Sequence, residues 1–185
     1  MGEAEIDIYN HSIIINAHII TYGNAADENL TELIRTEIET LWNEPHETID
    51  IKGNKFLVSF HITAALNISI DEMEIYSNIN PRNNYFRIEE YAHGNISFVD
   101  GIGSNSGYFK LENLYKGSTT AAHEYGHTLG LQHPVNLDYR GKGIPPIMYP
   151  RGTLVDPPFQ YDPSKPAGVK GGTMHPIHRK VFAED

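Results

Sequence analysis

The sequence predicts an α+β fold in a single domain. Runs rich in β-branched and aromatic residues, typical of strands, fill much of the first 110 residues. One segment near residue 30 has apolar residues at helical spacing, and a later one carries histidines at that spacing. The 185 residues suffice for one well-buried core and are too few for two independent domains.

The N-terminal part is expected to form strands around one helix. The runs EIDIYN and SIIINAHIITYG have strand composition and end in turn-forming Asn and Gly. DENLTELIRTEIETLWNEP then changes period, with acids in its first turn and Pro45 at its far end. We expect an amphipathic helix whose apolar face holds Leu30, Leu33, Ile34, Ile38, Leu41 and Trp42.

The middle of the chain predicts further strands. ETIDIKGNKFLVSFHITAALN reads as two strands joined at Gly53-Asn54, and YFRIEEYA as another. Glycines interrupt NISFVDGIGSNSGYFKL, which indicates a bulged or looped edge. Prolines and glycines gather between Pro134 and Pro176, so this part should be irregular until HPIHRKVFAED, which predicts a short terminal helix.

Charge and composition exclude several classes of protein. The formal net charge of −10 argues against a nucleic-acid partner. Without cysteine the chain has no disulfide, no thiolate metal ligand and no cysteine nucleophile. No apolar run is long enough to cross a bilayer, and the first residues lack the basic start and apolar centre of a signal peptide.

The segment TTAAHEYGHTLGLQHP predicts a metal site. His123 and His127 are four residues apart, so on a helix both imidazoles project from one face and can reach one ion. Glu124 is rotated by about 100° from His123, which suits it to reach a metal-bound water rather than the metal. A histidine pair alone is more often a surface pair or a buried hydrogen-bonded pair, so the metal hypothesis depends on a third ligand.

His133 is the candidate third ligand. Gly130 can adopt a positive φ, which lets the chain turn and bring His133 back toward the ion, and Pro134 prevents the helix from resuming. Three imidazoles without a thiolate fit a catalytic zinc ion with an open fourth position, whereas calcium and magnesium prefer oxygen ligands. We therefore expect one Zn²⁺ ion held by His123, His127 and His133.

The segment HEYGHTLGLQH resembles the zinc signature H-E-x-x-H-x-x-G-x-x-H of the metzincin metallopeptidases. In that clan a methionine turn lies under the zinc site, and Met148 in IPPIMYP resembles the matrixin version of this turn. By resemblance Met148 would form an apolar floor below the ligands. An ordinary core methionine is the alternative, and Met174 in GGTMHP is a more distant rival.

The resemblance covers residues 119–152 at the level of motifs, and it implies a zincin-like fold. That fold has a twisted, mostly parallel sheet with an antiparallel edge strand, a long backing helix, a zinc-site helix and a small irregular C-terminal subdomain ending in a helix. A cleft would separate an upper subdomain, residues 1–133, from a lower one, residues 134–185, of a single catalytic domain.

By the same resemblance the chain is a zinc-dependent endopeptidase in which Glu124 is the general base. An edge strand over residues 103–111 would hold an extended substrate through its backbone. The candidate substrate-binding residues are Gly103, Ser104, Asn105, Tyr149, Pro150 and Arg151. Arg151 would either favour acidic substrates or form a salt bridge with Asp156.

Several departures from the clan leave the subfamily open. Pro150 stands where astacin-like and serralysin-like members carry a tyrosine that approaches zinc, so Tyr149 is not assigned as a ligand. The loop around Asp100 resembles the calcium-binding loop of matrixins but is nearly without carboxylates, so a metal-free glycine-rich turn is favoured over a structural Ca²⁺ site.

Expectations about partners and location follow from the same resemblance. It implies protein or peptide substrates and a secreted or extracellular location, while the missing signal peptide is compatible with a domain of a larger protein. We also expect a monomer. The alternative function is a zinc-stabilised, non-catalytic binding module on a zincin scaffold.

Overall fold

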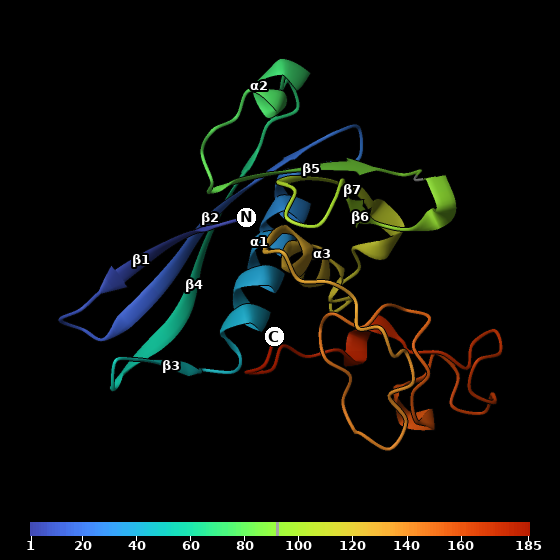
Figure 1. Cartoon of the computed structure of the whole chain (residues 1–185). Helices are drawn as coiled ribbons and strands as arrows, with labels where there is room; N and C mark the ends of the chain where they lie inside the picture. The colour runs from blue at the N-terminus through green and yellow to red at the C-terminus, as the bar shows by residue number, and fades with distance from the viewer. Residues whose placement is uncertain (92) are drawn as a thin grey trace.

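The computed structural model describes residues 1–91 and 93–185, and its described strands form one curled, mixed sheet (Figure 1). The strand order is β3-β4-β2-β5-β7-β6, and β1 also pairs with β2. The strands are β1 (Glu3–Asp7), β2 (Ser12–Tyr22), β3 (Thr48–Ile51), β4 (Asn54–Leu66), β5 (Asn83–Glu89), β6 (Phe98–Val99) and β7 (Ser106–Lys110). The expected α+β class is confirmed.

The parallel pairs lie in the middle of the sheet. β4, β2, β5 and β7 run parallel to one another, whereas β1, β3 and β6 are antiparallel to their neighbours. Antiparallel strands therefore occur at three places, not at a single edge as expected. In the β3–β4 hairpin Ile51 pairs with Asn54, so Lys52 and Gly53 form the turn, with φ of 54° and 84°. The sequence prediction was one residue too late.

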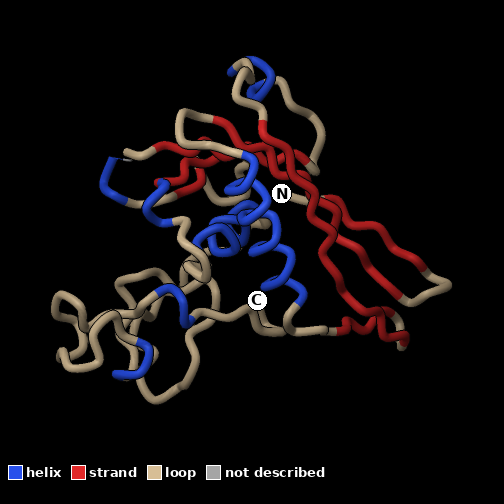
Figure 2. Tube along the Cα trace, turned by 180° about the vertical axis from the view of Figure 1, so that it is seen from behind, coloured by secondary structure: helices blue, strands red, loops and turns tan. Residues whose placement is uncertain are grey.

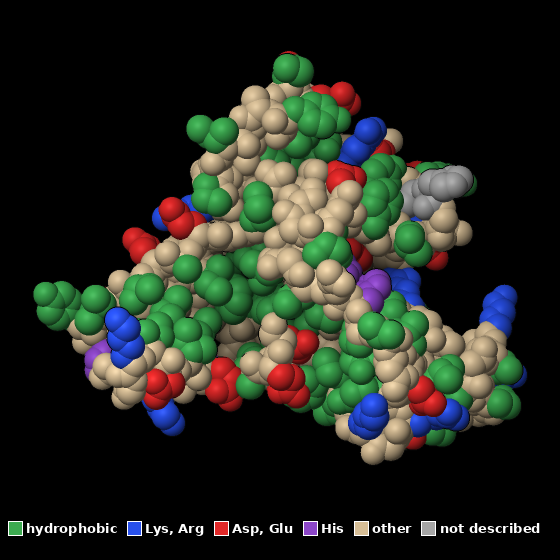
Figure 3. All heavy atoms as spheres, viewed as in Figure 1, with side chains coloured by type: hydrophobic (Ala, Val, Ile, Leu, Met, Phe, Trp, Pro, Cys, Tyr) green, Lys and Arg blue, Asp and Glu red, His purple; other side chains and the backbone are tan. Residues whose placement is uncertain are grey.

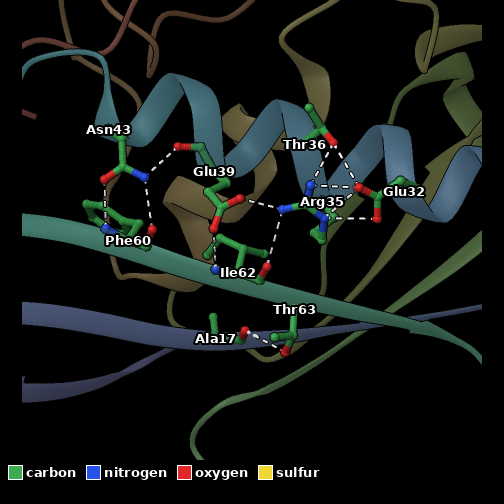
Figure 4. Close-up of polar contacts among 9 residues, drawn as sticks. All are labelled: Ala17, Glu32, Arg35, Thr36, Glu39, Asn43, Phe60, Ile62 and Thr63. Carbon is green, nitrogen blue, oxygen red and sulfur yellow. Dashed lines mark hydrogen bonds and ion pairs between the residues drawn. The ribbon is translucent and has the colours of Figure 1, made fainter.

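Helix α1 (Glu28–Asn43) confirms the predicted amphipathic helix. It begins after Asp27, whose side chain accepts a hydrogen bond from the Leu30 N–H. Its far end is fastened to β4 by Asn43, which exchanges two hydrogen bonds with the Phe60 backbone at 2.8 and 2.9 Å (Figure 4). Glu39 accepts a hydrogen bond from the Ile62 N–H in the same view. These contacts fix α1 across the sheet.

The other elements are short. They are α2 (Glu72–Tyr76), α3 (Thr120–Thr128) and the 3₁₀ turns η1 (His93–Asn95), η2 (Leu111–Asn113), η3 (Pro157–Phe159) and η4 (Pro176–His178). Helix α3 packs against α1 and β6, and Figures 1 and 2 both place α3 beside α1. Among the described helices, none combines the length and apolarity needed to span a bilayer.

The segment after His133 is mostly irregular, as predicted, and loops dominate it in Figure 2. The expected terminal helix is wrong, because only the turn η4 forms there. Beyond it the Lys180 N–H donates to the Pro145 carbonyl at 3.0 Å, and Val181 is 6 % exposed within the core. These long-range contacts draw Lys180 and Val181 away from a helical path, so the turn that begins at Pro176 does not continue as a helix.

Candidate metal centre

Helix α3 is positioned at its N-terminus by a residue of α1. The Glu37 carboxylate accepts hydrogen bonds from the Ala121 and Ala122 N–H groups at 2.9 and 3.4 Å, and Ser118 accepts one from the Thr120 N–H at 3.2 Å. Ser118 thus satisfies one N–H group at the start of the helix, and the contribution of Glu37 was not predicted from the sequence. Its signal was present, because Glu37 lies three residues after Ile34 and four before Leu41, on the apolar face of α1.

Three histidines converge beyond this helix start. The Nε2 atom of His133 lies 3.0 Å from Nε2 of His123 and 3.0 Å from Nε2 of His127. Ligands at the usual zinc–nitrogen distance of about 2.0–2.1 Å in a tetrahedron lie about 3.3 Å apart. Two of the separations are thus close to this spacing, and the three ligand atoms all lie within 4.8 Å of one another, so they could hold one metal ion.

The opposite ring nitrogens orient two of these imidazoles. Nδ1 of His123 lies 2.7 Å from the Ile147 carbonyl, and Nδ1 of His127 lies 2.7 Å from the Leu131 carbonyl. A carbonyl can only accept, so each Nδ1 carries the hydrogen and each Nε2 presents its lone pair. This is the tautomer that a metal ligand needs.

The turn after α3 brings His133 to the other two histidines. Gly130 has a φ of 99°, in the region that favours glycine. The Leu131 N–H bonds to the Gly126 carbonyl at 3.1 Å, and the Leu131 carbonyl faces His127. One turn therefore both ends the helix and anchors a ligand.

The environment keeps the three imidazoles neutral. Burial lowers the pKa of His123 well below 6.5, with a further contribution from the Arg179 charge. Burial also lowers the pKa of His127 and of His133. Neutral imidazoles are the metal-binding form, so neutral pH favours binding of a cation.

Glu124 lines a cavity of about 670 Å³ together with the three histidines. The Glu124 side chain is buried and has no hydrogen bond to any residue in the described part of the chain. Burial raises the pKa of Glu124 to about 8, and the positive charges of Arg179 and Arg151 oppose this increase. In Figure 3 histidine and Lys or Arg side chains meet at a recess beside the C-terminal segment.

Met148 packs under α3. Its side chain is 4 % exposed, and a Cβ atom added to Gly126 would lie 2.4 Å from the Met148 sulfur. Gly126 is thus the position that lets the methionine approach the helix. Met174 is also buried but lies elsewhere, next to Gln160 and with its N–H on the Thr153 carbonyl.

Two of the six expected substrate residues line the cavity. Pro150 and Arg151 line the cavity, and Gly152 joins them. Tyr149 packs against Tyr139 instead, with ring centroids 4.8 Å apart. The remaining three candidates lie outside the cavity lining; they are Gly103, Ser104 and Asn105. The Gly103 N–H donates to the His127 carbonyl, and the Asn105 carbonyl accepts from the Tyr85 N–H.

The expected edge strand over residues 103–111 is wrong. Residues 106–110 of this range form β7, which lies between β5 and β6, so both edges of β7 are paired. The strand that ends the sheet beside the cavity is β6, which contributes Phe98 and Val99 to the lining. Phe98 and Val99 belong to a segment predicted from the sequence to be a bulged or looped edge, and they form the end strand of the sheet.

Arg179 is a cavity residue that the sequence did not indicate. Its side chain is 4 % exposed, and Nε and Nη1 donate to the Thr119 hydroxyl and the Tyr149 carbonyl at 2.8 and 3.2 Å. Burial lowers the pKa of Arg179 to about 10, and the Glu124 charge opposes this change, so the guanidinium is protonated at neutral pH. It joins the start of α3 to the residue after Met148.

No protein-family model matches this chain, and no curated protein matches it in sequence. Function is therefore inferred from the arrangement of these side chains.

Proposed function

We propose that the chain is a zinc-dependent endopeptidase that hydrolyses internal bonds of extended polypeptides. The observation that carries the proposal is the convergence of three neutral imidazoles beside a buried carboxylate without a protein partner, all facing one open cavity. His123, His127 and His133 would hold the ion. A site of three nitrogen ligands that opens to a cavity suits catalysis better than structural support.

Bound zinc would supply a Lewis acid and lower the pKa of a coordinated water toward about 7. Glu124 would accept a proton from the attacking water at a carboxylate oxygen and deliver a proton to the leaving amide nitrogen. A general base works best when its pKa is near the working pH, and burial moves Glu124 in that direction.

The backbone of β6 would orient the substrate. This strand ends the sheet next to the cavity, and it pairs with β7 along one side. An extended peptide could add along its other side, which would hold the scissile bond beside the three histidines. Residues 150–152 would then contact the substrate side chains, because they line the same cavity.

The test is cleavage of a diverse quenched peptide library by zinc-loaded protein and by Glu124→Gln at matched zinc content. We expect the variant to lose about 10²–10⁴-fold in turnover, the usual contribution of a general base. Glu74→Gln, which changes an exposed acid on α2, is the matched control and should retain turnover.

Equal cleavage by wild type and Glu124→Gln would contradict the assigned base. If zinc bound at one equivalent and no peptide in the library were cleaved, a zinc-stabilised binding module would replace the peptidase as the better explanation.

A further inference from the structure

The cavity beside the histidines carries an excess of positive charge from the chain itself. Its lining contains two arginines, Arg151 and Arg179, and among the described residues that line it Glu124 is the one carboxylate. The chain as a whole has a net charge of −10, so this local balance is opposite to that of the molecule. Such a concentration of charge favours an anionic ligand.

The Arg179 guanidinium is held in place by hydrogen bonds that use only some of its N–H donors. The hydrogen bonds of its Nε and Nη1 go to neutral oxygens and hold the planar group in place. Its Nη2 donates to no described residue, and none of the described salt bridges includes Arg179. A buried cation without a contacting carboxylate is costly, and an anion in the cavity would offset that cost.

Arg151 adds a second positive charge, and its side chain forms fewer hydrogen bonds than that of Arg179. It is half-buried, and its hydrogen bond, from Nη2 to the Thr120 hydroxyl, is long at 3.4 Å. The expected salt bridge to Asp156 is not among the described ion pairs, and Asp156 accepts a hydrogen bond from the Gly141 N–H. Arg151 therefore keeps donors for a ligand.

Among the described residues, the acids whose charges act on these arginines form no salt bridge with them. Glu124 lines the same cavity, and the other two, Glu37 and Glu112, bond elsewhere. Glu37 accepts from two N–H groups at the start of α3, and Glu112 pairs with Lys110. Neither takes the role of a counterion in contact with Arg151 or Arg179. The two guanidinium groups thus remain available to the space that the substrate would enter.

We propose that Arg151 and Arg179 bind a carboxylate of the substrate next to the scissile bond, so that the enzyme prefers acidic sequences. This inference rests on the proposed peptidase function. The carboxylate could belong to an Asp or Glu side chain or to the C-terminus of a peptide, and both offer the planar oxygen pair that a guanidinium binds with two hydrogen bonds.

The first experiment compares peptides that differ only beside the cleaved bond: Glu, Gln or Lys in an internal position, and a terminal residue as free acid or amide. We expect kcat/KM to be about tenfold or more higher for at least one carboxylate peptide than for its neutral partner, as for a hydrogen bond to a charged group. The pair that shows the preference identifies the source of the carboxylate. Equal rates within both pairs would overturn the proposal.

The variants test which side chains are responsible. Arg151→Gln should abolish most of the preference, because kcat/KM should fall by a larger factor for the carboxylate peptide than for its neutral partner. Lys170→Gln, which removes an exposed positive charge outside the cavity lining, should keep the preference. A uniform loss for both peptides in Arg151→Gln would contradict carboxylate binding.

Arg179 requires a conservative change because its side chain is buried and hydrogen-bonded. Arg179→Lys keeps the charge but loses the fork, so it should reduce the preference in protein that melts cooperatively and still binds zinc. If the preference survived in both Arg151→Gln and Arg179→Lys, the proposed site would be wrong.

A binding measurement separates this inference from the peptidase proposal. Fluorescence anisotropy with the labelled Glu and Gln peptides and the acid and amide peptides would be measured on zinc-loaded Glu124→Gln and on metal-stripped wild type. Tighter binding of the carboxylate peptide that depends on Arg151, without cleavage by any form, would support the site and reject the peptidase. If wild type cleaved the peptides but bound both members of each pair equally, the result would support the peptidase and reject the carboxylate site.

Discussion

The two parts of the chain that meet at His133 contribute to the metal centre in different ways. Residues 1–133 supply regular elements, and helix α3 directs His123 and His127 from one face. Residues 134–185 contain 3₁₀ turns and isolated bridges among their described residues, yet they supply the Ile147 carbonyl, Met148 and Arg179. The first part directs two histidine side chains through the regular geometry of a helix. The second part supplies individual supporting groups from its loops.

This difference predicts how substitutions in each part would weaken metal binding. A helix distributes its hydrogen bonds over many residues, so one change at its surface seldom redirects a side chain on the opposite face. In the irregular part each supporting group depends on one or two contacts, such as the His123 to Ile147 bond. Substitutions there should affect the metal more often through orientation than through loss of a ligand.

The largest effect on zinc affinity is expected from a change at His133, where the two parts meet. His133→Ala removes one of three ligands, and zinc affinity should fall by more than about 100-fold, since loss of supporting groups alone costs about 10–100-fold. Competition with a chromogenic chelator would measure the affinity. His61→Ala, at an exposed histidine of β4, is the matched control. Unchanged one-to-one binding by His133→Ala would exclude the three-histidine site.

The sequence predicted the regular part of the molecule better than the irregular part. The spacing of Leu30 through Trp42 is sufficient for α1, because a repeated apolar face is a local property. The predicted position of the β3–β4 turn was wrong by one residue, because Lys52 adopts a positive φ that a lysine does not predict. The terminal helix was wrong because distant contacts draw Lys180 and Val181 away from a helical path.

The same distinction applies to the candidate site. The histidines lie in one short segment, so their spacing could indicate a shared ion, and the structure brings them together. Glu37 could have been found as an acid on an apolar helix face. Arg179 could not, because it lies 55 residues beyond Glu124, the difference of the two positions, in a segment without periodicity.

The second prediction compares two buried methionines of the irregular part. Met148 is 4 % exposed and Met174 is 0 % exposed, so replacing either with Ala should destabilise the fold by about 2–5 kcal/mol. Only Met148→Ala should also weaken zinc binding, by about tenfold, because Met148 packs against α3. Denaturant unfolding and chelator competition give the two quantities.

Equal zinc affinity in the two methionine variants would show that the methionine under α3 stabilises the core without positioning the ligands. A loss confined to Met174→Ala would make Met174 the residue that supports the metal site.

The third prediction tests the contact between the two parts directly. Gly126→Ala places a methyl group against the Met148 sulfur and Trp42, which should cost about 1–3 kcal/mol of unfolding free energy. In a Met148→Ala background the clash with sulfur is gone, so the same change should cost less. A coupling free energy of about 0.5–3 kcal/mol would express this contact, and strict additivity would contradict it.

The smallest expected effects lie in the regular part, at two helix starts that look alike in sequence. Asp27 caps α1 by accepting from the Leu30 N–H at 2.8 Å, and Asp71 caps α2 by accepting from the Met73 N–H at 2.9 Å. Asp27→Ala should cost about 1 kcal/mol of unfolding free energy, because α1 is packed on the sheet and unfolds with it. Helix α2 buries none of its residues, so it can unfold locally and Asp71→Ala should cost less than about 0.5 kcal/mol.

Urea denaturation of both variants would measure these costs, with zinc affinity as a second readout that should change in neither. A larger loss from Asp71→Ala than from Asp27→Ala would mean that α2 unfolds together with the core. A change in zinc affinity in Asp27→Ala would mean that the stability of α1 affects the metal centre. The hydrogen bonds from the start of α3 to Glu37 would link the two.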